Sequence, residues 1–484
     1  MEDRHRPAWA PRAAGHLVTG STASEGPVRP VSTAPSPGRS ALRPLVVAQL
    51  VSLTGTHVTA LALPTLAVLL LDAGPVAAAL IFALEYGARG LTAPLVGVLI
   101  DSVRSPRRLL VANDLLHALV VASVPAMYLL DVLSLPYLVV VAACSGILSG
   151  VTDISINAVL PRLVPADRLV GANASLAGAR AAGQIAGPAI GGLLVQALGA
   201  ALAIAVDTVS YLASAVVFSR LRGADRSAPE QPAVTAPVSR WAALRRSAAD
   251  LRTSLRKGLG TFREIPLLGR LALATAALNV GGAGLGALYT LYAYRTLELS
   301  PFQVGALWGV NSAAALAAVA TARRVVGRFG LDRSIALFAP VAAGSLLLIP
   351  AASLAAPLLL FVVYELIFGY CATVWAVASA TLQQQLVPAE RLGRVIAFSR
   401  TVSILAVPVG ALVGGVAADV WGLPGTLTGF ALLALAGTAT VTGRIGRRPD
   451  ANPPDTRSQP GPPAGPAAGE PTGGEPTGDR AARH

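Results

Sequence analysis

Several ionisable side chains stand inside long apolar stretches of this 484-residue chain, where they are well placed to do chemistry. Glu365 lies in such a stretch with no base near it in the sequence. An acid is costly to bury in apolar surroundings, and acids in such places commonly carry protons or ions. Glu365 is therefore the best single candidate in the second half of the chain for an acid that takes up and releases a proton.

Other ionisable residues leave two interpretations open. Glu85 and Arg89 are four residues apart and share one face of a helix, as an internal ion pair or as a proton site tuned by Arg89. Asp114 and His117, three apart, are a second pair, for which a structural role is favoured, although Asp114 stays a proton-coupling candidate. We expect Arg180 to find its neutralising partner on another helix.

Aromatic side chains follow the same stretch as Glu365. Their spacings of three, four and seven residues place them on one stripe of a helix: Phe361, Tyr364, Phe368 and Trp375. Such a stripe beside an acid suits an apolar or cationic organic molecule, although aromatic residues also pack between helices. No Cys and His residues have metal-ligand spacing, so we predict neither a metal nor a cofactor.

The amino-acid composition indicates what kind of structural element contains these residues. The chain is 54% hydrophobic and 13% charged, whereas soluble domains are about 25% charged. This balance excludes a soluble enzyme and predicts an all-α polytopic membrane protein. Twelve apolar segments are long enough to span a bilayer: 44–71, 75–100, 107–130, 134–158, 171–197, 199–219, 268–294, 302–321, 334–352, 356–381, 395–419 and 424–443.

Basic residues set the expected orientation. They gather in the loops after even-numbered segments and in 220–267, so both termini are predicted to be cytoplasmic. The net charge of +13 is therefore a topology signal, and no nucleic-acid partner is predicted. The expected organisation has five parts: a disordered tail (1–43), a six-helix bundle (44–219), a linker with a surface helix (220–267), a second bundle (268–445) and a disordered tail (446–484).

An internal repeat relates the two predicted bundles. The heptapeptide at 163–169, Leu-Val-Pro-Ala-Asp-Arg-Leu, recurs at 386–392 with Glu in place of Asp. At the same offset of 223 residues, Gly187 corresponds to Gly410 and Gly191 to Gly414. Six-span repeats of equal orientation are typical of one large class of transporters.

Four stretches carry a resemblance to a known family. They are Ser52-Leu-Thr-Gly with Ala62-Leu-Pro, Gly97-Val-Leu-Ile-Asp with Arg107 and Arg108, Leu163-Val-Pro with Gly171-Ala-Asn, and Gly183-x3-Gly-Pro-x2-Gly-Gly192. Over residues 43–445 the chain resembles the major facilitator superfamily, in particular its macrolide and enterobactin exporters. The resemblance implies twelve helices in two six-helix bundles, a central cavity and alternating access. It also implies that the side chain of His57 faces this cavity. Arg89 and Arg180 are further candidates for residues that line the cavity or contact the substrate.

The fifth segment carries the most informative motif. Its small residues are Gly183, Gly187, Gly191 and Gly192, which let another backbone approach, and Pro188 bends the helix. In the family this pattern marks antiporters, and we expect a pivot or a seal on the cytoplasmic side. Ordinary packing of small residues is the alternative.

A cytoplasmic gate is also implied by the resemblance. In the family the acid at the position of Asp101 helps to lock the two halves, and Arg394 and Arg400 are plausible partners. Arg107 and Arg108 belong to the same loop, where anchoring by positive charge is the alternative. This copy departs from the family, because Ser102 stands where an Arg is usual.

The sequence thus predicts a secondary exporter of a small amphipathic molecule, exchanged for protons, in a bacterial plasma membrane. An uptake permease and a non-transporting sensor are the alternatives, and no enzyme activity is expected because the loop acids are isolated. A monomer with bilayer lipid, a small-molecule substrate and protons as partners is expected. Segment 134–158 contains no base, so the proton acceptor stays unassigned.

Overall fold

The computed structural model describes residues 37–92, 96, 103, 105–220, 262 and 264–445. The first half contains these elements: α1 (Pro37–Leu69), α2 (Pro75–Leu91), α4 (Pro106–Leu129), α5 (Leu135–Leu163), the 3-10 turn η1 (Ala166–Arg168), α6 (Leu169–Leu198) and α7 (Ala200–Arg220). The second half contains α9 (Pro266–Arg295), α10 (Pro301–Phe329), α11 (Leu331–Ser345), α12 (Leu348–Ala351), α13 (Pro357–Leu386) and α14 (Ala389–Ile445).

Local sequence explains where many helices begin. Proline stands in the first turn of α2, α4, α9, α10 and α13, where its missing N–H removes no helical hydrogen bond. At α10 a capping box adds to this, because the Ser300 hydroxyl accepts from the Gln303 N–H while the Gln303 side chain accepts from the Ser300 N–H. The ends of the spans are therefore encoded locally.

The prediction of an all-α polytopic membrane protein is confirmed. In the described part of the chain, ten helices are long and apolar enough to cross a membrane. One of them, α14, contains two predicted segments, separated at Gly422 by a left-handed backbone conformation (φ 76°). The predicted segment 334–352 is divided between α11 and α12. Residues 1–36, most of the linker with its predicted surface helix, and 446–484 lie outside the described residues, whereas 37–43 of the predicted N-terminal tail belong to α1. The domain boundaries stay a prediction.

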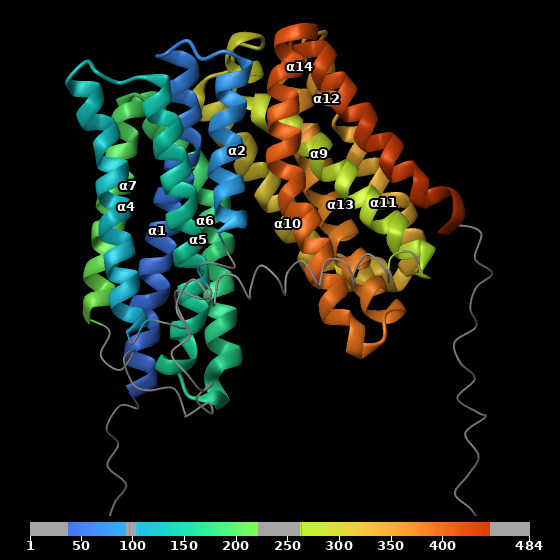
Figure 1. The fold of residues 1–484 in the computed structure, drawn as a ribbon, viewed down its shortest axis with the longest axis horizontal. Helices are drawn as coiled ribbons and strands as arrows, with labels where there is room; N and C mark the ends of the chain where they lie inside the picture. The colour runs from blue at the N-terminus through green and yellow to red at the C-terminus, as the bar shows by residue number, and fades with distance from the viewer. Residues whose placement is uncertain are drawn as a thin grey trace, which may run out of the picture.

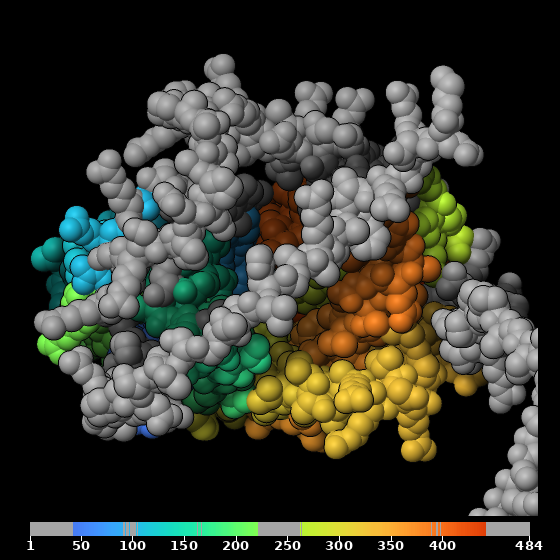
Figure 2. All heavy atoms as spheres, turned by 90° about the horizontal axis from the view of Figure 1, so that it is seen from below, coloured from blue at the N-terminus to red at the C-terminus, as the bar shows by residue number. Residues whose placement is uncertain are grey.

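The helices form two bundles that lie side by side (Figure 1). Seen from below, the blue to green helices of the first half and the yellow to orange helices of the second occupy different sides (Figure 2). We call the end at which α1 and α9 begin the tail face. The opposite end, the far face, carries the turns at Asp72, Asp131 and Glu298, each in a left-handed conformation.

Near the far face, the two bundles are in close backbone contact at glycine residues. A side chain at Gly192 of α6 would lie 2.5 Å from the carbonyl oxygen of Pro301, and one at Gly305 of α10 would lie 2.2 Å from that of Pro188. On the other side of the interface, Gly415 of α14 packs in the same way against α2. No side chain fits into these gaps without a backbone shift, so glycine is required for the close approach.

Polar contacts join the halves at the same level. Arg295, at the end of α9, forms an ion pair with Asp72 beyond the end of α1. The Thr65 and Tyr294 hydroxyl groups are hydrogen-bonded at 2.9 Å, also between α1 and α9. The far face is therefore closed in this conformation.

We predict that Gly192→Leu separates the halves at the far face, because the new side chain would collide with the backbone of Pro301. The measurement is the yield of a disulfide between cysteines placed at Asp72 and Arg295, which should fall strongly. Gly178→Leu, on the same helix but with no atom within 4 Å of the new Cβ, is the matched control and should leave the yield unchanged. Equal yields in the two variants would contradict the prediction.

Candidate functional site

A cavity of about 820 Å³ lies between the two halves. Its walls come from α9, α13 and α14 of the second half and from α2 of the first half. Gln383 and Gln384, in the last turn of α13, belong to the lining, so the cavity extends towards the tail face. A space of this size is typical of a site for a small organic molecule.

Aromatic side chains dominate one part of the cavity. Of the predicted stripe, Tyr364, Phe368 and Trp375 line the wall, and the rings of Tyr364 and Phe368 have centroids 5.5 Å apart. Phe82 and Tyr86 of α2 complete this wall, with centroids 4.6 Å apart. The sequence analysis missed these two residues, although their spacing of four on the helix of Glu85 was a usable signal.

Polar groups line the part of the cavity nearer the tail face. The amides of Asn279, Gln383 and Gln384 are present together with the guanidinium of Arg400. Arg400 was predicted to belong to a gate, but the structure places it in the cavity wall. The reason is that α14 begins at Ala389, six residues before the predicted segment, so Arg400 lies three turns inside the helix.

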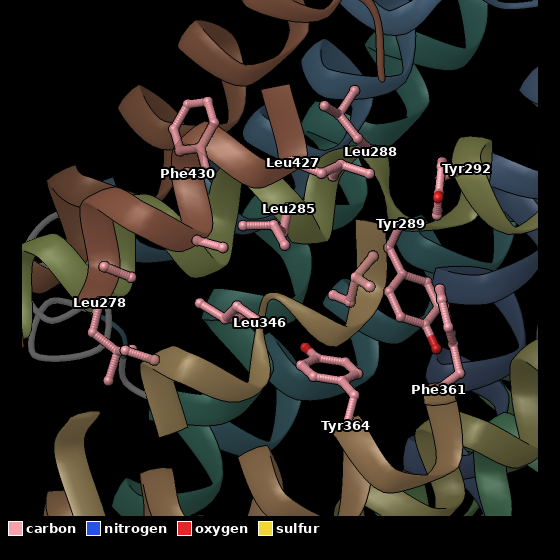
Figure 3. Close-up of a cluster of buried hydrophobic side chains, with 14 of the residues drawn as sticks. Leu278, Leu285, Leu288, Tyr289, Tyr292, Leu346, Phe361, Tyr364, Leu427 and Phe430 are labelled. Atoms are coloured by element: carbon pink, nitrogen blue, oxygen red, sulfur yellow. The ribbon is translucent and has the colours of Figure 1, made fainter. Parts of the chain in front are cut away.

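Glu365 is turned away from the cavity into the second bundle. The side chain is 3% exposed, and the Tyr289 hydroxyl donates a hydrogen bond of 2.7 Å to its Oε1 atom. The Asn311 amide donates to the backbone carbonyl of the same residue at 3.3 Å. Figure 3 shows Tyr289 beside Phe361 and near Tyr364, in the apolar cluster that surrounds this acid. Glu365 is thus adjacent to the cavity wall but separated from the space by its own helix.

Of the two interpretations of Glu85 and Arg89, the internal ion pair is not formed in the described structure. Arg89 binds Asp153 of α5, with its Nε atom 2.8 Å from Oδ2. The backbones of α2 and α5 approach closely at Gly146 and Gly150, so the arginine reaches the neighbouring helix. Glu85 instead lines a small separate cavity between α1, α2, α9 and α10.

The predicted pairing of Asp114 with His117 is also not formed. The ring of His117 stacks on Tyr211 of α7 with centroids 4.0 Å apart. Both carboxyl oxygens of Asp114 are buried, and in the described part of the chain neither has a hydrogen-bond partner. The two residues therefore do not pair with each other, and the ring of His117 packs against α7 instead.

Asp207, in the first bundle, is a buried acid whose carboxyl group accepts two side-chain hydrogen bonds. It is fully buried on α7, accepting from the Thr59 hydroxyl at 2.5 Å and from the Ser210 hydroxyl at 2.7 Å. A side chain at Gly55 of α1 would overlap the carboxyl group, so glycine makes room for it. Asp207 thus links α1 to α7 inside the bundle.

The glycine motif packs α6 against two partners. Gly183, Gly187 and Gly191 face α1, and a side chain at Gly187 would lie 2.8 Å from the Cβ atom of His57. His57 therefore lies at the contact of α1 with α6 and is not among the residues that line the large cavity. Gly192 and the Pro188 carbonyl face α10 near the far face, and the pivot or seal stays a prediction.

The remaining predicted residues lie partly outside the described part of the chain, and the gate stays a prediction. Asp101 lies outside the described residues, as does the side chain of Arg394. Arg107 donates to the Ser219 carbonyl at 2.7 Å within its own half, and Arg108 is exposed. Arg180 is half-buried, and no salt bridge to it is present in the described part of the chain.

The sequence model of the Major Facilitator Superfamily matches residues 45–403, about three quarters of the chain. The chain belongs to the Major Facilitator Superfamily. It is accordingly a membrane transporter of the all-α fold of this superfamily, and no curated protein matches it closely enough to refine the assignment.

Solved structures of Major Facilitator Superfamily type share the fold. A bacterial homologue of the iron transporter ferroportin, in an inward-facing state, has 18% identity and a TM-score of 0.64, covering 84% of this chain and 99% of its own. A bacterial homologue of the human lysosomal transporter Spinster, inward-facing and unoccupied, has 11% identity and a TM-score of 0.62, covering 85% and 98%. A POT family transporter in complex with 5-aminolevulinic acid has 12% identity and a TM-score of 0.65, covering 84% and 96%.

We predict that Asp207→Val destabilises the first bundle of this Major Facilitator Superfamily protein. The substitution leaves the Thr59 and Ser210 hydroxyl groups buried without their acceptor, at about 1–3 kcal/mol for each group. Thermal unfolding of the purified protein in detergent should show a lower Tm. Asp419→Val, at an exposed position of α14, is the control and should keep the Tm of the unchanged protein. A Tm for Asp207→Val equal to that of the control would refute the role of Asp207.

Proposed function

We propose that this protein is a secondary active exporter, which moves a small amphipathic organic molecule out of the cell by alternating access. The observation that carries the proposal is the cavity of about 820 Å³ between the halves, with aromatic walls at its inner end and polar groups towards the tail face. With the far face closed, this geometry suits the state that collects its substrate from the tail face.

The direction of transport rests on the sequence. The motif from Gly183 to Gly192, with Pro188, resembles the antiporter pattern. Within the superfamily, the sequence resembles the branch that contains the macrolide and enterobactin exporters. An uptake permease of the same fold is the second candidate, because the similar structures include a nucleoside transporter. The tail face is assigned to the cytoplasm of a bacterial plasma membrane from the distribution of Arg and Lys.

Alternating access requires the contacts at the far face to part. The ion pair of Asp72 with Arg295 lies at the surface, where such pairs contribute about 0–1 kcal/mol, so it is easily broken. The glycine contacts of α6 with α10 and of α2 with α14 let the helices slide without side chains interlocking. The same contacts therefore permit both a closed and an open far face.

Glu365 is the proposed proton carrier in the second half. It is buried, it has no base beside it in the described part of the chain, and the Tyr289 hydroxyl holds its side chain. Its helix also carries Tyr364 and Phe368 in the cavity wall. A change in the protonation of Glu365 would therefore act on the helix that contacts the substrate.

We expect Glu365→Gln to abolish pH-driven export while leaving the protein folded, because the amide oxygen can still accept from Tyr289 but cannot release a proton. A substrate is first found by an accumulation screen in an efflux-deficient host. Its movement is then measured in proteoliposomes with an imposed pH gradient. Asp419→Asn, an exposed acid, is the matched control and should keep full activity. Full pH-driven export by Glu365→Gln would remove this residue from the coupling mechanism.

The orientation is tested with single cysteines in a variant whose native Cys144 and Cys371 are replaced by Ala. A cysteine at the exposed position Asp131, on the far face, should react with a membrane-impermeant maleimide added to intact cells. A cysteine at the exposed position Arg333, on the tail face, should react only after the cells are opened. The reverse pattern would overturn the assignment of the tail face to the cytoplasm.

A further inference from the structure

The charges around the large cavity have one sign. Arg400 contributes a guanidinium group to the wall, and among the described residues that line the cavity there is no carboxylate. No salt bridge to Arg400 is present in the described part of the chain. A guanidinium group facing a cavity without a protein partner is available to an anionic ligand.

The nearest acids are kept away from this space. Glu365 points to Tyr289 behind the α13 wall, and Glu85 lies in the small cavity beyond Phe82 and Tyr86. The side chain of Asp153 is already bound to Arg89. None of these carboxylates is placed to bind a cation in the large cavity, so of the expected apolar or cationic molecule the cationic option is not favoured.

The polar and aromatic residues are separated along the length of the cavity. Gln383 and Gln384 lie in the last turn of α13, whereas Phe368 lies about four turns earlier on the same helix and Tyr364 one turn beyond it. Arg400 and Trp375 each lie about three turns from the tail-face end of their helix. A ligand in this cavity therefore meets rings at one end, amides at the other and a cation between them.

We propose that the cavity binds an amphipathic aromatic carboxylate. Its ring system would lie among Tyr364, Phe368, Trp375 and the two aromatic residues of α2, where stacking is favourable. Its carboxylate would be held by Arg400, in a bidentate geometry that lysine does not reproduce, with the amides of Gln383 and Gln384 as further donors. This inference names the substrate class of the proposed exporter and rests on that proposal for the direction of transport.

Three probes with the same ring test the charge preference: naphthoate, naphthamide and naphthylmethylammonium. Their binding to the purified full chain in detergent is measured by calorimetry at neutral pH. Naphthoate should bind at least about tenfold more tightly than the other two, as expected for a charge-assisted pair. Tighter or equal binding of the ammonium probe would overturn the proposal, and so would the absence of binding by all three probes.

Variants of Arg400 test the residue itself. Arg400→Gln should weaken naphthoate binding by about tenfold and leave naphthamide binding unchanged, whereas Arg400→Lys should lie between. Arg333→Gln removes an exposed arginine away from the cavity and should change neither affinity. Unchanged naphthoate binding in Arg400→Gln would contradict the assignment.

Binding and transport separate the two proposals. The affinities in detergent depend neither on the direction of movement nor on protons. If vesicle experiments show uptake, or no movement driven by protons, the exporter proposal fails while the preference for a carboxylate stands. If export is found but the ammonium probe is preferred, the substrate class fails while the exporter stands.

Discussion

The close approach of helix backbones between the two halves is the constraint on which the rest of the structure depends. At Gly192 and Gly305 nothing larger than hydrogen fits between α6 and α10, and Gly415 repeats the arrangement where α14 meets α2. These contacts bring the bundles together near the far face, and Gly87 and Gly90 of α2 continue the contact along α14. The space that remains towards the tail face is the cavity, so the position of the glycines determines the position of the site.

Much of the fold follows from patterns that are local in the sequence. Apolar length, proline at helix starts and the offset of 223 residues between the repeats predict the spans and the relation of the halves. Pairings between helices do not follow, because spacing shows which residues share a face but not which helix packs against it. Arg89 thus shares a face with Glu85 yet binds Asp153, and His117 lies near Asp114 in sequence yet stacks on Tyr211.

The residues of the candidate site, like the fold, could be predicted from the sequence only where the signal lies within one helix. Regular spacing on one helix identified Tyr364, Phe368 and Trp375, all of which line the cavity. The first-half contribution of α2 was missed because it depends on packing between distant segments. Arg400, a predicted gate partner, was expected near the start of its helix, but α14 begins six residues before the predicted segment, so the side chain lies almost two turns deeper, in the cavity wall.

The cavity wall is unequally shared, since three of its four helices belong to the second half. The glycine contacts between the halves run along α6 with α10, which do not line the cavity, and along α2 with α14, which do. The glycines themselves are not among the residues that α2 and α14 contribute to the wall. Substitutions at the cavity-lining side chains of α13 therefore change the shape and polarity of the site while leaving the glycine contacts that join the two halves in place.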